Sequence, residues 1–250
     1  MKRDFKIWRG DQNSGKFVLY SIEVEDGMVV LDSLHKIQSQ CASDMAVRWN
    51  CKAGKCGSCS MEINGHPKLA CMTRMNEFSN DQTIVIQPLK TFPLIKDLVT
   101  DVSWNYKQNK KISPFNPREK KPNKERIMYQ QDVERIQEFR KCIECYLCQD
   151  VCHVLRDHKQ KDEFVGPRFM IRLASLEMHP LDIENRIPYI KHEYGSGMCN
   201  ITRCCTNVCP EHIQITDNGI IPLKERVVDK FYDPIMWLYN KVFGSEVRLN

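Results

Sequence analysis

The sequence lacks any long run of apolar residues. Its longest apolar stretches, near "MVVL" and "GIIPL", fall far short of the roughly 20 residues that span a bilayer. The first residues, "MKRDFKIWRGD", lead directly into alternating apolar and polar residues. We therefore expect a chain without a transmembrane helix and without a cleaved leader.

A strong charge excess and a phosphate-binding glycine loop are also missing. The 37 basic residues exceed the 32 acidic ones by only 5, which is too mild to indicate a nucleic-acid partner. No G-x-G-x-x-G motif is present, and that motif is what binds the phosphates of a dinucleotide. We therefore expect neither catalytic groups nor a hydride acceptor in this chain.

Cysteine is abundant, with 13 residues in 250. The count is odd, several cysteines are separated by only two residues, and no secretory leader is apparent. Such patterns are typical of metal sites in a reducing compartment, because disulfides are rare there. The cysteines are therefore predicted to bind metal, with disulfide bridges as the weaker alternative.

Periodicity predicts an α+β protein with two domains. Residues 1–104 read as a small sheet crossed by one helix, with hairpins at 5–24 and 59–71. Residues 105–126 form a basic segment with three prolines and no apolar periodicity, so we expect a linker. Residues 127–250 turn to helical spacing and predict a mostly α domain.

The first group of cysteines follows the plant-type spacing C-x4-C-x2-C…C. Its members are Cys51, Cys56, Cys59 and Cys71, and this spacing is typical of a [2Fe–2S] cluster. The residues between them are small, so the loop can direct backbone N–H groups at the cluster sulfurs. Structural zinc is the alternative, although zinc sites usually pair two short cysteine knuckles.

Two further groups follow the pattern of a two-cluster bacterial ferredoxin, in which the fourth cysteine of each motif crosses to the other cluster. The stretch "CIECYLCQDVC" contains the full motif, whereas "CNITRCCTNVCP" has Thr202 in its second cysteine position. The crossing pattern assigns a [4Fe–4S] cluster to Cys142, Cys145, Cys148 and Cys209. It assigns the other cluster to Cys152, Cys199 and Cys205, and three thiolates predict [3Fe–4S].

Two cysteines are left over by this assignment. Cys204 is adjacent to a predicted ligand, so a four-iron cluster completed by Cys204, water or Thr202 stays an alternative for the third site. Cys41 follows the predicted helix of the first domain and is expected to be a small packing residue.

At this point the chain resembles the iron–sulfur subunit of the succinate dehydrogenase and fumarate reductase family. The likeness rests on "RWNCKAGKCGSC", "NGHPKLACMT", "CIECYLCQDVC", "GPRFMIRLA" and "CNITRCCTNVCP", which follow one another along nearly the whole chain. The resemblance implies a β-grasp plant-type ferredoxin domain followed by an all-α bacterial-ferredoxin-like domain. It also implies electron transfer through [2Fe–2S], [4Fe–4S] and [3Fe–4S] clusters, without a substrate site in this chain.

The same resemblance implies the partners. They are a flavoprotein subunit with FAD and one or more membrane anchor subunits with quinone and possibly haem, on the cytoplasmic face of a bacterial inner membrane. The family commonly has proline after the fourth cysteine of the first helical motif and tryptophan a few residues later, whereas this chain reads "CHVLRDHKQKDEF". It thus resembles a non-standard branch, in which we expect His153 or Asn200 near the quinone.

Two other functions stay open from the sequence. A related flavoenzyme complex, such as one coupled to thiols, would use the same cysteines. A zinc-stabilised binding module without a redox role is the alternative of a different class.

Overall fold

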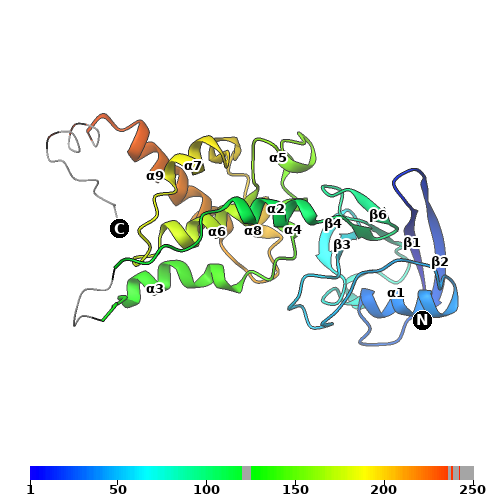
Figure 1. The fold of residues 1–250 in the computed structure, drawn as a ribbon. Helices are drawn as coiled ribbons and strands as arrows, with labels where there is room; N and C mark the ends of the chain where they lie inside the picture. Colours follow the sequence, from blue (N-terminus) through cyan, green and yellow to red (C-terminus); the bar gives the residue numbers. More distant parts are fainter. Residues whose placement is uncertain (120–124, 236–237, 239–241, 243–250) are drawn as a thin grey trace.

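The computed structural model describes residues 1–119 and 125–235, together with residues 238 and 242. Part of the predicted linker, residues 120–124, and most of the predicted second domain beyond residue 235 therefore lie outside the described residues. Figure 1 shows a sheet domain at one end of the molecule and a helical domain at the other. Helix α4 (Leu147–Asp150) of the helical domain contacts strand β4 (His66–Leu69) of the sheet domain.

The N-terminal domain is a five-stranded sheet in the order β2-β1-β5-β3-β4, in which β1 and β5 are parallel and the other neighbours antiparallel. Buried and exposed residues alternate along the first half of β1, and Phe5 and Ile7 are completely buried. Successive side chains of a strand point to opposite faces, so this pattern places one face of β1 on the core. The turn of the second hairpin uses Asn64 and Gly65, both with positive φ, as a tight hairpin requires. The elements are β1 (Lys2–Gly10), β2 (Gly15–Glu23), α1 (Val30–Gln40), β3 (Ser60–Ile63), β4 (His66–Leu69), η1 (Met75–Glu77), β5 (Ile84–Gln87), β6 (Leu94–Lys96) and β7 (Val99–Thr100).

The second domain packs short helices around α6 (Pro167–Glu177), whose Phe169, Met170 and Leu173 are almost fully buried. The predicted α+β class with a sheet domain followed by a helical domain is confirmed. Among the described residues, no helix combines the length and apolar character needed to cross a bilayer. The other elements are α2 (Ser103–Lys111), α3 (Gln130–Gln137), η2 (Glu138–Lys141), α4 (Leu147–Asp150), α5 (His153–Arg156), α7 (Ile187–His192), η3 (Ser196–Met198), α8 (Cys204–Asn207), the π-helical η4 (Ile215–Ile220) and α9 (Ile221–Phe231).

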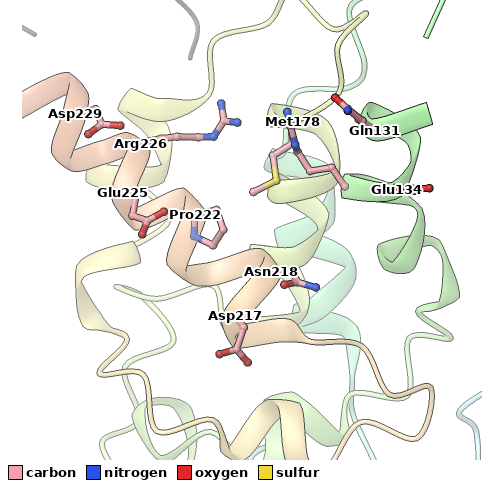
Figure 2. Close-up of a pocket in the computed structure, with 10 residues that line it drawn as sticks. Gln131, Glu134, Met178, Asp217, Asn218, Pro222, Glu225, Arg226 and Asp229 are labelled. Atoms are coloured by element: carbon pink, nitrogen blue, oxygen red, sulfur yellow. The ribbon is translucent and has the colours of Figure 1, made fainter. Parts of the chain in front are cut away.

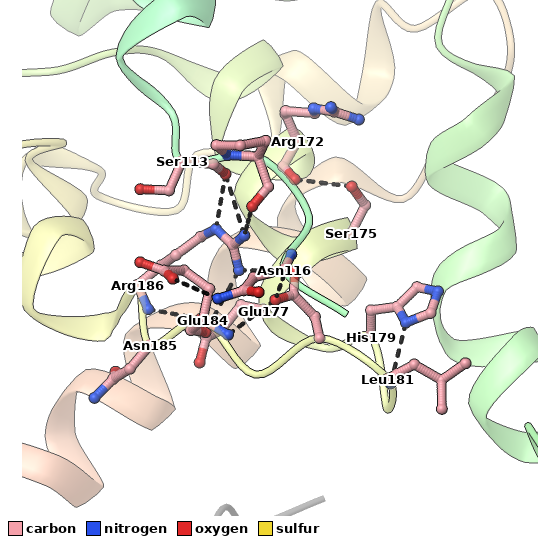
Figure 3. A network of polar contacts seen from close by, with 12 residues as sticks. Ser113, Asn116, Arg172, Ser175, Glu177, His179, Leu181, Glu184, Asn185 and Arg186 are labelled. Atoms are coloured by element: carbon pink, nitrogen blue, oxygen red, sulfur yellow. Dashed lines mark hydrogen bonds and ion pairs between the residues drawn. The ribbon is translucent and has the colours of Figure 1, made fainter. Parts of the chain in front are cut away.

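The described part of the predicted linker is held against the helical domain. It begins with helix α2, and the chain after that helix passes over a buried ion pair between Arg186 and Asp182, 3.0 Å apart. Arg186 donates hydrogen bonds to the backbone oxygens of Ser113 and Pro114, as Figure 3 shows. These contacts are made to backbone oxygens and not to apolar side chains. Apolar periodicity in the sequence of the segment therefore could not predict them.

Buried charges join the two domains. Glu62 of β3 and Asp150 of α4 are both fully buried, and Arg156 of α5 lies 2.9 Å from Glu62 and 3.8 Å from Asp150. The backbone N–H of Thr91 donates to Asp150 at 2.9 Å. A buried charge needs partners of this kind, so these side chains fix how the helical domain meets the sheet.

Candidate iron–sulfur centres

The first candidate centre is the loop of residues 51–59, which follows α1 in the sheet domain. Lys52, Gly54 and Gly57 adopt positive φ, and the resulting tight loop turns backbone N–H groups toward sulfur. The N–H groups of Ala53 and Lys55 lie 3.4 and 3.3 Å from the sulfur of Cys51. This is the arrangement expected from the small residues of the loop, and such hydrogen bonds stabilise negative charge on ligand sulfur.

The four thiols of this centre form two pairs. Cys56 is hydrogen-bonded to Cys51, and Cys59 is hydrogen-bonded to Cys71, which follows the second hairpin. Each pair can chelate one iron, so the donor set fits a cluster of two irons with two thiolates on each.

The two pairs differ in their electrostatic surroundings. Burial raises the pKa of the Cys59 thiol to about 12. Burial acts in the same direction at Cys56, but hydrogen bonds from Ser58 and Cys51 outweigh it and lower the pKa to about 7. Ligation requires thiolates, so the Cys56 thiol is close to its ligating form near neutral pH, whereas the Cys59 thiol needs the charge of a metal.

The second candidate centre is a cavity at the start of α4. Its cysteines are Cys142, Cys145, Cys148 and Cys209, the four predicted [4Fe–4S] ligands. Burial raises the pKa of Cys145 to about 12 and that of Cys148 well above its usual value. The other side chains on the wall are mainly apolar: Ile143, Tyr146, Arg168, Ile171, Pro210, Glu211, Ile213 and Ile215.

The third candidate centre is a cavity between α5, α8 and η4. The three predicted [3Fe–4S] ligands, Cys152, Cys199 and Cys205, line it, and Thr202 and Cys204 line it as well. Burial raises the pKa of Cys152 to about 11 and that of Cys205 to about 12. The structure therefore brings each predicted ligand set together around its own loop or cavity.

The backbones of the second and third cysteine loops repeat each other. Glu144 and Tyr146 have positive φ before α4, and Ile201 and Arg203 have positive φ at the same positions before α8. Positive φ is costly for a β-branched residue such as Ile201, so the loop holds this shape against local preference. The repeat places Thr202 where the second loop has Cys145.

This correspondence leads to a prediction for the third centre. Replacing Thr202 with cysteine is expected to supply the missing thiolate and convert a three-iron cluster into a four-iron cube. The oxidised [3Fe–4S] signal in electron paramagnetic resonance (EPR) spectra should disappear. Cys204→Ser is the matched control and should retain that signal, because Cys204 occupies the position of Leu147 in the repeat. Loss of the third cluster in Cys204→Ser would identify Cys204 as a ligand instead.

The three centres lie in sequence through the molecule. A Cβ atom added to Gly57 of the first loop would lie 2.5 Å from the Cα of Cys145, and Ser60 donates a hydrogen bond of 2.8 Å to the backbone oxygen of Cys145. The second and third centres share α4 and its flanking residues, because Cys148 faces one cavity and Cys152 the other.

The structure also places the two residues predicted near a quinone. His153, the first residue of α5, and Asn200 both line the third cavity. The ring of His153 is 6.0 Å from that of His158. Cys41, in contrast, is exposed at the end of α1, so the expectation that it is a packing residue is wrong.

Sequence reasoning missed two polar neighbours of the third centre. Thr216 lies 3.4 Å from the sulfur of Cys205, and Lys224 of α9 donates to the backbone oxygen of Cys199 at 2.6 Å. Both residues follow the cysteine motif in the chain, and the spacing of the cysteines gives no information about residues beyond the motif. The only local signal is the π-helical turn of η4, which frequently marks functional sites but could not be read from the sequence.

A charged groove lies between η4, α9 and α3. Asp217 and Asn218 of η4 line it together with side chains of α9 and α3, which Figure 2 labels. The groove has a volume of about 530 Å³, and Asp217 pairs with Arg203 at 2.9 Å. Its lining is Gln131, Glu134, Arg135, Met178, Asp217, Asn218, Pro222, Glu225, Arg226 and Asp229. Thus η4 contributes Thr216 to the wall of the third cavity and Asp217 and Asn218 to the lining of the groove.

The predicted ligands of all three centres are thiols. Among the residues that the structure describes, no three or more His, Cys, Asp or Glu side chains are grouped around a point where a single metal ion could sit. The cysteines instead form two pairs in the first loop and a ring around each of the two cavities.

Comparison with known proteins agrees with these centres. Residues 4–107 match the 2Fe-2S iron-sulfur cluster binding domain, and residues 138–213 match the 4Fe-4S dicluster domain. A chain of the Sdh1 complex of Mycobacterium smegmatis in the apo form has the same fold, with a TM-score of 0.91 and 56% sequence identity. The match covers 94% of this chain and 98% of that chain.

Two curated relatives extend the comparison. The succinate dehydrogenase iron-sulfur subunit of Paracoccus denitrificans is 28% identical over 91% of this chain and 89% of its own length. An uncharacterized iron-sulfur protein of Methanocaldococcus jannaschii is 32% identical over 88% of this chain but only 43% of its own length. The chain thus spans less than half the length of the archaeal relatives that it matches.

Proposed function

Because the chain belongs to the family of iron–sulfur subunits of succinate dehydrogenases and fumarate reductases, we propose that it transfers electrons between a flavin and a membrane quinone. The flavin belongs to a partner subunit with FAD, and the quinone is bound at one or more membrane anchor subunits. In this proposal the chain is the electron-transfer subunit of succinate:quinone oxidoreductase or quinol:fumarate reductase. It has no substrate site of its own.

One observation carries the proposal: the three cysteine centres follow one another without a gap. Gly57 of the first loop packs on Cys145 of the second cavity, and α4 with its flanking residues contributes Cys148 to the second cavity and Cys152 to the third. An electron that enters at the sheet domain thus passes each centre in turn before it reaches the wall of the third cavity.

The chain's own residues provide the binding sites. Cys51, Cys56, Cys59 and Cys71 would hold [2Fe–2S], Cys142, Cys145, Cys148 and Cys209 would hold [4Fe–4S], and Cys152, Cys199 and Cys205 would hold [3Fe–4S]. When bound, the clusters supply one-electron redox chemistry. Apolar residues such as Ile143 and Ile213 line the second centre, whereas the exposed Asn200 and Thr202 border the third. The two centres therefore differ in exposure to water, which is one of the factors that set the potential.

The third cavity is the proposed exit. His153 and Asn200 lie on its wall, and an imidazole can both donate a hydrogen bond to a quinone oxygen and transfer a proton near neutral pH. We assign this face to the membrane side of the complex, with the protein peripheral on the cytoplasmic face of a bacterial inner membrane.

Anaerobic purification of the native complex through this chain tests the proposal. We expect about nine irons per copy of the chain and no stoichiometric zinc, since the three predicted clusters require that number. Succinate should reduce quinone in the same sample. Stoichiometric zinc with little iron would refute the redox role, whereas full iron content with thiol-dependent but no quinone-dependent activity would favour the thiol-coupled alternative.

A further inference from the structure

A buried hydroxyl group lies against one predicted ligand of the third centre. Thr216, in the π-helical η4, has only 1% of its surface exposed. Its Oγ1 atom lies 3.4 Å from the sulfur of Cys205, within the distance of a hydrogen bond to sulfur. Thr216 also lines the third cavity, so the contact belongs to the wall of the centre.

The neighbouring threonine fixes the direction of this hydrogen bond. The N–H of Thr216 donates to Oγ1 of Thr206 at 3.0 Å, and that hydroxyl donates in turn to Oγ1 of Thr216 at 3.1 Å. The Thr216 oxygen thus accepts from Thr206 and has its own proton left to donate. A ligand thiolate has no proton and can only accept, so the Thr216 hydroxyl is the donor to Cys205.

We propose that the Thr206–Thr216 hydroxyl pair raises the reduction potential of the third cluster by donating a hydrogen bond to the sulfur of Cys205. This inference rests on the proposed function and its ligand assignment. Reduction adds one electron, which arrives from the neighbouring second centre, and its negative charge is shared with the ligand sulfurs. A donor fixed on such a sulfur stabilises the reduced state more than the oxidised state, which raises the potential.

Cys148, the equivalent cysteine of the second centre, has different neighbours. In the backbone repeat Cys148 corresponds to Cys205, and isoleucines such as Ile171 and Ile215 share its cavity. Among the described residues, no side-chain hydroxyl is hydrogen-bonded to Cys148. The hydroxyl pair therefore acts on the third cluster alone, and the resulting difference in potential directs electrons from the second centre to the third.

Thr216→Val tests the inference, because valine keeps the shape of threonine and removes the hydroxyl. In EPR-monitored redox titration of the purified complex, we expect the midpoint potential of the third cluster to fall. The ratio of reduced to oxidised cluster at a fixed potential should drop on the order of tenfold, or about 59 mV for one electron. Thr216→Ser retains the hydroxyl and should keep the original potential. The first and second clusters serve as internal references.

The outcomes separate this inference from the proposed function. An unchanged third-cluster potential in Thr216→Val overturns the inference, while absence of any third-cluster signal in the unmodified protein overturns the ligand assignment. If the valine variant does not assemble, pulsed EPR of the unmodified protein in H2O and D2O decides. An exchangeable proton coupled to the third cluster supports the hydrogen bond, and its absence refutes it.

Discussion

Replacing Gly57 with alanine is expected to separate the first cluster from the second. The new Cβ would lie 2.5 Å from the Cα of Cys145 and 2.8 Å from its backbone nitrogen, and backbone atoms cannot move aside as a flexible side chain can. Gly57 also has φ +67°, which costs an alanine roughly 1–2 kcal/mol. Overpacking adds about 1–3 kcal/mol, so relief should come from displacement of the loop.

Gly65→Ala is the matched control for this variant. Gly65 has a comparable φ of +79°, but no atom lies within 4 Å of its added Cβ, so it shares the backbone cost and not the clash. In Gly57→Ala we expect the [2Fe–2S] EPR signal to persist while its magnetic coupling to the second cluster weakens, with a loss of succinate-dependent quinone reduction of at least about tenfold. Equal effects of the two variants would show that the contact with Cys145 is unimportant.

The sequence predicts those parts of the molecule that depend on local pattern. The two hairpins follow from alternation and from turn residues such as Asn64 and Gly65. The cysteine groups are found because most members of each predicted ligand set lie in one short loop, so chain spacing reflects spatial spacing. The repeat of the second and third loops is also local, and it supports the interpretation of Thr202 as the missing ligand position.

Contacts between distant segments could not be predicted in this way. The described part of the predicted linker is held by Arg186, which is about 70 residues further along the chain. Glu62 and Asp150 come from different domains, and each alone reads as an ordinary surface acid. Thr216 is related to Cys205 only through the path of η4. In each case a polar group finds its partner across the fold, and no periodicity records such a pairing.

The domain contact offers the second large effect. Replacing Arg156 with methionine is expected to leave the carboxyl groups of Glu62 and Asp150 buried against each other without their guanidinium partner. Removal of one partner from a buried charged group costs about 3–5 kcal/mol. For a domain of this size, that corresponds to a fall in the thermal unfolding midpoint of roughly 10 °C at fixed scan rate. Lys68→Met is the control, because its ion pair with Glu77 is exposed and should contribute at most about 1 kcal/mol.

The loss should depend on pH in a direction set by Asp150. Burial, together with the nearby Glu62, raises the pKa of Asp150 from 3.8 to about 7. An acid whose pKa is raised by folding destabilises the protein when ionised, so its contribution to stability improves as the pH falls through 7 toward 3.8. Arg156→Met should therefore be most destabilised near about pH 8.5 and partly recover near about pH 6, where Asp150 binds a proton. Adding Asp150→Asn to this variant removes the titrating group and should abolish the recovery, whereas a recovery that persists would assign the titration to another residue.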